Sequence, residues 1–232
     1  MSKIEDPGLK DRIYNYVRDL ILTLQIKPGE KVPEVRIAQE LGVSRPLVRE
    51  AVRHLSWDGL IKLEPNRAAT VVVMDQQMIQ DLAFVRWQHD QLAIPLAVYH
   101  GSPRDFNELR MTANRCLEAN AAGDLPLRHD LDAAFHRKIY QLAGNQLLYD
   151  LHCRLSMLVR LWQALHITSP AMLADGLQQH LALVDCFEQR DVAGALQVIQ
   201  SHSTCSFGSD FHGRLLTPQD LLQLRQQEAE LL

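Results

Sequence analysis

Apolar side chains recur at helical spacing through the first part of the chain and then alternate as in strands. They predict a helix over residues 9–24, a second helix that ends at Gly42, and a third that begins at Ser44. Two strand-like segments, 60–63 and 70–73, follow and flank a turn. Helix, turn, helix and a two-stranded wing is the pattern of a winged helix-turn-helix.

The polar face of the third predicted helix carries Arg45, Arg49 and Arg53, four residues apart. Side chains at this spacing share one face, so they can reach the phosphates and base edges of duplex DNA together. Ser44 can cap the helix, and the free N–H groups there suit a phosphate. An ordinary solvated basic face has the same spacing, so the pattern alone leaves both interpretations open.

From Asp75 onwards the chain is helical in pattern, with turn signals at regular intervals such as Gly144-Asn145. The periodicity predicts helices near residues 76–100, 104–122, 126–143, 146–167, 170–189 and 191–210. A short further helix is expected after Thr217-Pro218. The predicted fold class is mostly α: an N-terminal winged helix-turn-helix over residues 1–74 and a C-terminal six-helix antiparallel bundle over residues 75–232.

Charge is unevenly divided along the 232 residues, although the net charge is only −4. Residues 1–74 hold 12 Lys and Arg against 10 Asp and Glu, whereas the remaining residues hold 12 against 18. The cationic half is the one with the helix-turn-helix, as nucleic-acid binding requires. With no apparent leader peptide or membrane-spanning run, we predict a cytoplasmic protein whose cysteines are free thiols: Cys116, Cys153, Cys186 and Cys205.

Asp132 and His136 are four residues apart, so they project from one face of a predicted helix. His180 and His202 lie on two later helices joined by a tight turn, which lets their imidazoles face each other. Three imidazoles and one carboxylate suit Zn²⁺ or a similar divalent ion. Because the chain has ten histidines, ordinary core or surface residues are the alternative interpretation.

Two segments resemble known protein families. LGVSRPLVREAVRHLSWDGLI resembles the signature of the GntR-type winged helix, and LDAAFHRKIYQLAGN resembles the FCD domain of FadR-type regulators, with six bundle helices similar to the VanR-like branch. In the wing, Ala68 stands where the family usually has Gly. The resemblance implies DNA contacts from the following residues: Arg36, Ser44, Arg45, Pro46, Arg49, Arg53, Asn66 and Arg67.

The FCD resemblance also implies a metal ion at the base of an effector cavity, held by the aspartate and three histidines described above. Zinc is the first choice, with nickel, manganese or iron as alternatives. Open positions on the ion suit a small carboxylate, which Arg86 and Arg160 are candidates to neutralise. Simple pairing with acids such as Asp90 is the alternative for these arginines. Gln179 replaces a Glu that is frequent in the family beside His180.

We therefore predict a transcription regulator and no enzyme. It is expected to bind a palindromic operator in double-stranded DNA as a homodimer, and to be a repressor that a small organic acid releases. The alternative is a metal-dependent hydrolase with the helix-turn-helix as a scaffold, but the chain has no HExxH motif and no spare Glu within a turn of His136 or His180. A bundle whose four residues bind no ion is a third possibility.

Overall fold

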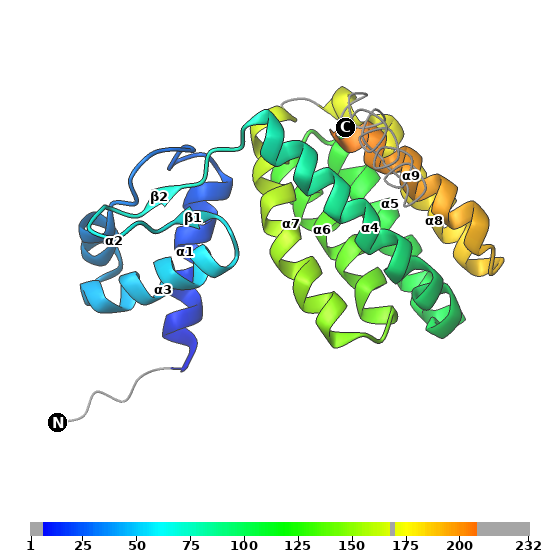
Figure 1. Cartoon of the computed structure of the whole chain (residues 1–232). Coiled ribbons are helices and arrows are strands. Elements are labelled where there is room, and N and C mark those ends of the chain that lie inside the picture. The colour runs from blue at the N-terminus through cyan, green and yellow to red at the C-terminus, as the bar shows by residue number, and fades with distance from the viewer. Residues whose placement is uncertain (1–6, 168–169, 208–232) are drawn as a thin grey trace, which may run out of the picture.

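The computed structural model describes residues 7–167 and 170–207, which form an N-terminal head and a larger helical body (Figure 1). The head contains α1 (Pro7–Leu22), α2 (Glu34–Leu41), α3 (Arg45–Trp57), β1 (Ile61–Lys62) and β2 (Thr70–Val71). The body contains α4 (Gln76–His100), α5 (Pro103–Ala121), α6 (Leu125–Leu142), α7 (Gln146–His166), the 3₁₀ turn η1 (Pro170–Leu173), α8 (Ala174–Glu188) and α9 (Val192–Phe207). The predicted fold class is confirmed, while the division between residues 74 and 75 stays a prediction.

The core of the head lies where the apolar faces of α1 and α3 meet. Ile13 and Val17 of α1 pack with Val48 and Leu55 of α3, and all four are almost completely buried. Burying each such side chain contributes roughly 1.5–3 kcal/mol. The turn between α2 and α3 depends on Gly42, whose φ of +63° ends α2 in the left-handed conformation.

The wing is shorter than the predicted strands. β1 and β2 pair antiparallel over two residues each, with Ile61 opposite Val71. At the wing tip the left-handed residue is Asn66, with φ +59°, and Ala68 has no positive φ. Since Asn tolerates this conformation, the absence of Gly at position 68 causes no backbone strain.

Side-chain caps fix where the body helices begin. The carboxylate of Asp75 accepts a 2.8 Å hydrogen bond from the backbone N–H of Met78 at the start of α4. Asp191 accepts one of 2.9 Å from Gly194 at the start of α9, as predicted for Asp191. Equivalent caps, each satisfying an N–H group that the helix leaves free, come from Ser102, Asp124 and Asn145.

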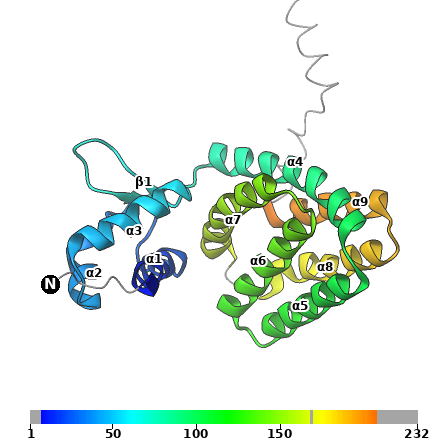
Figure 2. The same cartoon turned by 90° about the horizontal axis from the view of Figure 1, so that it is seen from below.

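The body helices pack side by side as a bundle (Figure 2). Five of them contribute buried side chains to one apolar cluster, among them Ile94, Phe106, Phe135, Phe187 and Ile199. The helix predicted near residues 170–189 is divided into η1 and α8, a tight first turn of the kind common at helix N-termini. The helix predicted after Thr217 lies outside the described residues.

The described cysteines Cys116, Cys153 and Cys186 are free thiols, as predicted, and the side chain of Cys205 lies outside the described part. No helix within residues 7–167 and 170–207 combines the length and apolar character needed to cross a bilayer.

The head contacts the body through α7. Leu161 of α7 is fully buried and belongs to the hydrophobic core of the head. Gly59, just after α3, has φ +83°, and a Cβ placed there would lie 3.5 Å from the side chain of Leu158. One face of α7 is thus packed closely against the head.

Candidate metal centre and nucleic-acid interface

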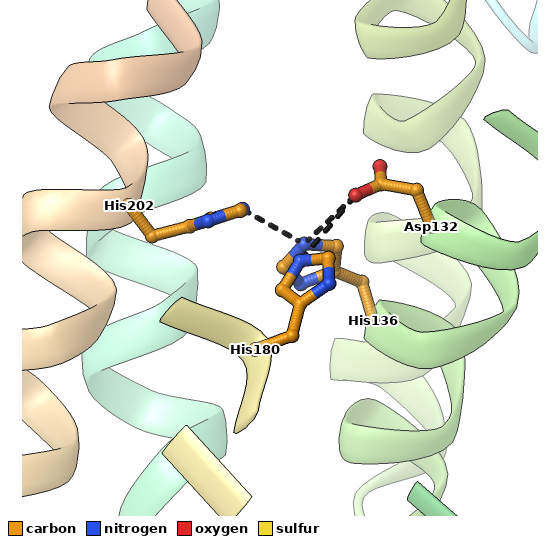
Figure 3. A group of neighbouring side chains, drawn as sticks. All are labelled: Asp132, His136, His180 and His202. Atoms are coloured by element: carbon orange, nitrogen blue, oxygen red, sulfur yellow. Dashed lines mark hydrogen bonds and ion pairs between the residues drawn. The ribbon is translucent and has the colours of Figure 1, made fainter. Parts of the chain in front are cut away.

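Four buried polar side chains converge inside the body (Figure 3). Asp132 and His136 project from α6, His180 from α8 and His202 from α9. One donor atom from each residue, a carboxylate oxygen or a ring nitrogen, lies within 4.8 Å of the others. The structure therefore brings together the four residues that the sequence predicted as metal ligands, and we call them the Asp-His cluster.

Ring nitrogens and the carboxylate face one another within the Asp-His cluster. His136 Nε2 lies 3.2 Å from His202 Nε2, and His180 Nε2 lies 3.4 Å from Asp132 Oδ1. Two nitrogens bound to one ion by bonds of about 2.0–2.1 Å can have such a separation.

Neighbouring groups orient two members of the Asp-His cluster. His202 Nδ1 lies 3.1 Å from the backbone oxygen of Gly176. A carbonyl oxygen only accepts, so this contact assigns the proton to Nδ1 and leaves a lone pair on Nε2. Gln163 of α7 donates a 3.0 Å hydrogen bond to Asp132 Oδ2, on the other side of the carboxylate from the histidines. Such partners hold a ligand in position before an ion arrives.

Burial keeps the three imidazoles neutral. It lowers the pKa of His180 to about 3, and it lowers the pKa values of His136 and His202 as well. For Asp132 burial acts in the raising direction, but the neighbouring His180 and His202 and the hydrogen bond from Gln163 bring its pKa below the usual value. The cluster therefore offers three lone pairs and one negative charge near neutral pH.

These residues fit a divalent metal ion. Neither ring nitrogen of His180 has a hydrogen-bond partner within the described part of the chain, although both are buried. Unsatisfied buried polar groups are rare because each costs roughly 1–3 kcal/mol. A donor set of three nitrogens and one oxygen matches zinc and the neighbouring transition metals. Coordination to such an ion would satisfy the imidazole lone pairs that have no hydrogen-bond donor.

Of the two predicted effector-binding arginines, Arg86 lies in the body interior. Its Nε is 3.1 Å from Asp90, one helical turn further along α4. The hydroxyl of Tyr140 donates a 2.7 Å hydrogen bond to the same carboxylate. After burial, the positive charge of Arg86 is the next cause that lowers the pKa of His136.

Arg160 lies instead at the junction of head and body. It pairs with Asp130 and lines a cavity of about 580 Å³ together with Arg18 and Leu24 of the head. Among the described residues that line this cavity there is no member of the Asp-His cluster. The structure thus places the two predicted arginines in different parts of the molecule, Arg86 in the body interior and Arg160 at the junction.

The sequence prediction missed three interior residues near the Asp-His cluster. Gln163 and His152 come from α7, and Arg128 lies one turn before Asp132 on α6. The spacing of Arg128 from Asp132 was a usable signal, because residues four apart share a helix face. The sequence held no such signal for the two α7 residues, because the rotation of α7 relative to α6 cannot be deduced from the sequence of either helix.

The arginines of α3 line an open groove of about 850 Å³ on the head. Arg45, Arg49 and Arg53 are all exposed on the face predicted for them. Arg36 of α2 and Arg67 of the wing line the same groove, whereas Asn66 lines a second groove beside the wing. The groove is thus bordered by guanidinium groups from α2, α3 and the wing.

The predicted capping of α3 by the Ser44 side chain is wrong. Ser44 occupies the N-cap position, but its hydroxyl accepts no capping hydrogen bond from the described N–H groups. Pro46 stands two residues later and has no N–H to donate, and the N–H of Leu47 bonds the backbone oxygen of Ser44 at 3.1 Å. Ser44 and Pro46 are both exposed at the groove end of α3.

Comparisons with known proteins agree with both halves of the molecule. Residues 9–71 match the family described as bacterial regulatory proteins, gntR family, and residues 82–204 match the FCD domain. The transcriptional regulator McbR of Escherichia coli (strain K12) is 24% identical over 197 residues, covering 83% of this chain and 88% of McbR. The repressor RspR of the same organism is 26% identical over 197 residues, covering 84% of this chain and 85% of RspR.

Solved structures share the fold. The structure of E. coli McbR/YncC superposes with a TM-score of 0.74 at 20% identity, covering 94% of this chain and 98% of that one. The structure of a GntR regulator from Rhodococcus sp. RHA1 gives a TM-score of 0.73 at 21% identity, covering 88% of this chain and 98% of that one. The matched families and relatives are transcription regulators, so the prediction of a regulator is confirmed and the hydrolase alternative is wrong. The chain belongs to the GntR family of bacterial transcription regulators, in the FadR-type group that carries an FCD domain.

Proposed function

We propose that the protein is a repressor that binds a palindromic operator as a homodimer in the cytoplasm and is released by a small carboxylate bound at a divalent metal ion. The observation that carries this proposal is the convergence of Asp132 and three neutral histidines inside the body. A relative, RspR, is named a repressor, which favours repression over activation.

The DNA-binding part of the proposal rests on the exposed arginines of α3. Arg45 and Arg49 reach base edges or phosphates, Arg53 and Arg36 contribute further positive charge, and Asn66 and Arg67 of the wing contact the adjacent backbone. Ser44 and Pro46 lie against a phosphate at the start of α3. Two copies of α3 about 34 Å apart read two half-sites.

An apolar stripe on the body supports the homodimer. Val85, Leu92 and Tyr99 of α4 are exposed and follow one another at seven-residue intervals. Leu147 and Leu151 add exposed apolar area on α7, which packs beside α4. Side chains seven apart share a helix face, and an exposed apolar stripe of this kind suits the same stripe of a second copy.

The effector part of the proposal rests on the coordination that the Asp-His cluster offers. Zinc is the first candidate ion, with nickel, manganese or iron as alternatives. Four protein ligands leave room for one or two oxygen atoms of a carboxylate on a five- or six-coordinate ion. Arg86 is better placed than Arg160 to act on that carboxylate, because it is buried in the body interior as the Asp-His cluster is, whereas Arg160 lies at the junction with the head.

Operator binding tests the DNA-binding part. Arg45→Ala and Arg49→Ala are each expected to weaken operator affinity in gel-shift titrations, by about 1–3 kcal/mol where a base contact is lost. Arg104→Ala, on the far body helix α5, is the matched control. Operator affinity equal to that of the native protein in both variants would overturn this part.

Metal analysis and thermal melting test the effector part. Purified protein is expected to contain about one divalent ion per chain, and small carboxylates are expected to raise its melting temperature by mass action. His180→Ala is expected to lose both properties, whereas His54→Ala, exposed on α3, keeps them. A native protein that neither binds an ion nor responds to any acid would overturn the proposed mechanism.

A further inference from the structure

Arg128 carries a fully buried charge for which the described residues provide no hydrogen-bond acceptor. It is the largest side chain in the described chain with no solvent exposure. None of its three guanidinium nitrogens has a hydrogen-bond partner among the described residues. The thiol of Cys116 donates to its backbone oxygen at 3.4 Å, and Cys116 belongs to a buried apolar cluster with Leu131 and Leu177.

The guanidinium group cannot escape this situation by losing its proton. Burial lowers the pKa of Arg128, but a guanidinium begins so far above neutrality that it stays charged. A buried and unpaired charge is strongly unfavourable unless a counter-charge is bound. The arrangement therefore calls for an anion that is supplied from outside the chain.

The Asp-His cluster provides no hydrogen bond to Arg128, although the negative charge of Asp132 opposes the effect of burial on the pKa of Arg128. Asp132 lies one turn after Arg128, yet it accepts a hydrogen bond from Gln163 and faces His180 and His136. If Asp132 ligates an ion, its negative charge is used by that ion.

A charge count for the interior indicates a dianion. The interior contains two guanidinium groups, Arg86 and Arg128, and two carboxylates, Asp90 and Asp132, and histidines that ligate an ion are neutral. A divalent ion adds two positive charges that no described interior group cancels. A ligand with one negative charge leaves one of them uncompensated, whereas a ligand with two does not.

We propose that the effector is a short dicarboxylate, with one carboxylate at the metal ion and the other held by the guanidinium of Arg128. This inference deepens the proposed function and rests on it. Arg128 and Asp132 are four residues apart and so lie on one face of α6, which favours a short ligand that reaches both the ion and the guanidinium group. A guanidinium group binds a carboxylate with two parallel hydrogen bonds, which fixes its orientation as well as its charge.

Calorimetric titration of the zinc-loaded full chain tests this inference. Succinate and glutarate are compared with butyrate and valerate, which have the same carbon chains and one carboxylate fewer. The native protein is expected to bind the dicarboxylates at least about tenfold more tightly, as a charged hydrogen-bonding pair allows. Arg128→Met keeps most of the side-chain volume and is expected to remove this preference, whereas Arg104→Met, exposed on α5, keeps it.

Thermal melting without acid gives a second readout. Removing an unpaired buried charge is expected to raise the melting temperature of ligand-free Arg128→Met above that of the native protein. The inference is overturned if the native protein binds the mono- and dicarboxylates within twofold of each other, or if Arg128→Met retains the preference. In either case binding of the monocarboxylates leaves the proposed function standing. If none of the four acids binds the zinc-loaded protein, the carboxylate effector itself is wrong and this inference falls with it.

Discussion

Leu161 and Gln163 lie two residues apart on α7 but contact different halves of the molecule. Gln163 donates a 3.0 Å hydrogen bond to Asp132 of the Asp-His cluster, whereas Leu161 is buried in the hydrophobic core of the DNA-binding head. Residues two apart point to roughly opposite sides of a helix. One rigid element therefore touches both the candidate metal centre and the head, which gives a direct physical route for coupling between them.

Removal of the amide at position 163 is expected to weaken metal binding. In Gln163→Leu the carboxylate of Asp132 loses a hydrogen bond that orients it, and losses of this kind typically lower metal affinity by about 10–100-fold. Zinc affinity can be measured by competition with a chromogenic chelator. Gln197→Leu, exposed on α9, is the matched control. Equal zinc affinity in Gln163→Leu and the native protein would contradict the assigned role of Gln163.

Truncation of Leu161 is expected to uncouple the head from the body. Leu161→Ala leaves a cavity at the junction and should lower the free energy of unfolding by about 2–5 kcal/mol. With the contact weakened, an acid that releases operator from the native protein should change operator affinity less, while zinc affinity stays the same. The measurement is a gel-shift titration with and without the acid.

Leu127→Ala provides the comparison for this experiment, because it removes the same atoms from a partly exposed site on α6. An effect of the acid that is undiminished in Leu161→Ala would show that the signal does not pass through this contact.

The apolar stripe on α4 leads to a prediction about assembly. Leu92 is 60% exposed at the middle of the stripe, so Leu92→Glu should place a charge inside the proposed dimer interface and produce monomers. Light scattering coupled to size-exclusion chromatography measures the mass directly. Met111→Glu alters a similarly exposed apolar side chain on α5, away from α4 and α7, and should leave the mass unchanged. A dimeric Leu92→Glu protein would exclude this stripe as the interface.

Much of the fold follows from the periodicity of apolar residues, because that periodicity identifies the buried face of each helix. The same argument located the exposed arginines of α3, and the i,i+4 spacing placed Asp132 beside His136. It could not show how α7 is rotated against α6, so Gln163 and the junction position of Arg160 were not foreseen. The Ser44 cap failed for a local reason, since Pro46 removes a donor that the hydroxyl would have used.

His152 gives the protein a pH dependence that is separate from metal binding. Its ring is buried, stacks on Tyr140 with ring centroids 3.9 Å apart, and has no hydrogen-bond partner for either nitrogen in the described chain. Burial, with a smaller contribution from Arg86, lowers the pKa of His152 to about 2. In the unfolded chain the pKa is about 6.5, so the unfolded state binds an extra proton between these two values.

The stability contributed by neutral His152 is therefore complete above about pH 6.5 and is lost progressively as the pH falls towards 2, by about 1.4 kcal/mol per pH unit. Urea denaturation of metal-free protein between pH 7 and pH 4 should show this slope together with that of the other buried histidines. His152→Leu cannot bind this proton in the folded or the unfolded state. As the pH falls, its free energy of unfolding should therefore decrease less steeply than that of the native protein, by about 1.4 kcal/mol per pH unit. Parallel curves for the two proteins would mean that His152 is already protonated in the folded state, against the burial and the missing partners seen here.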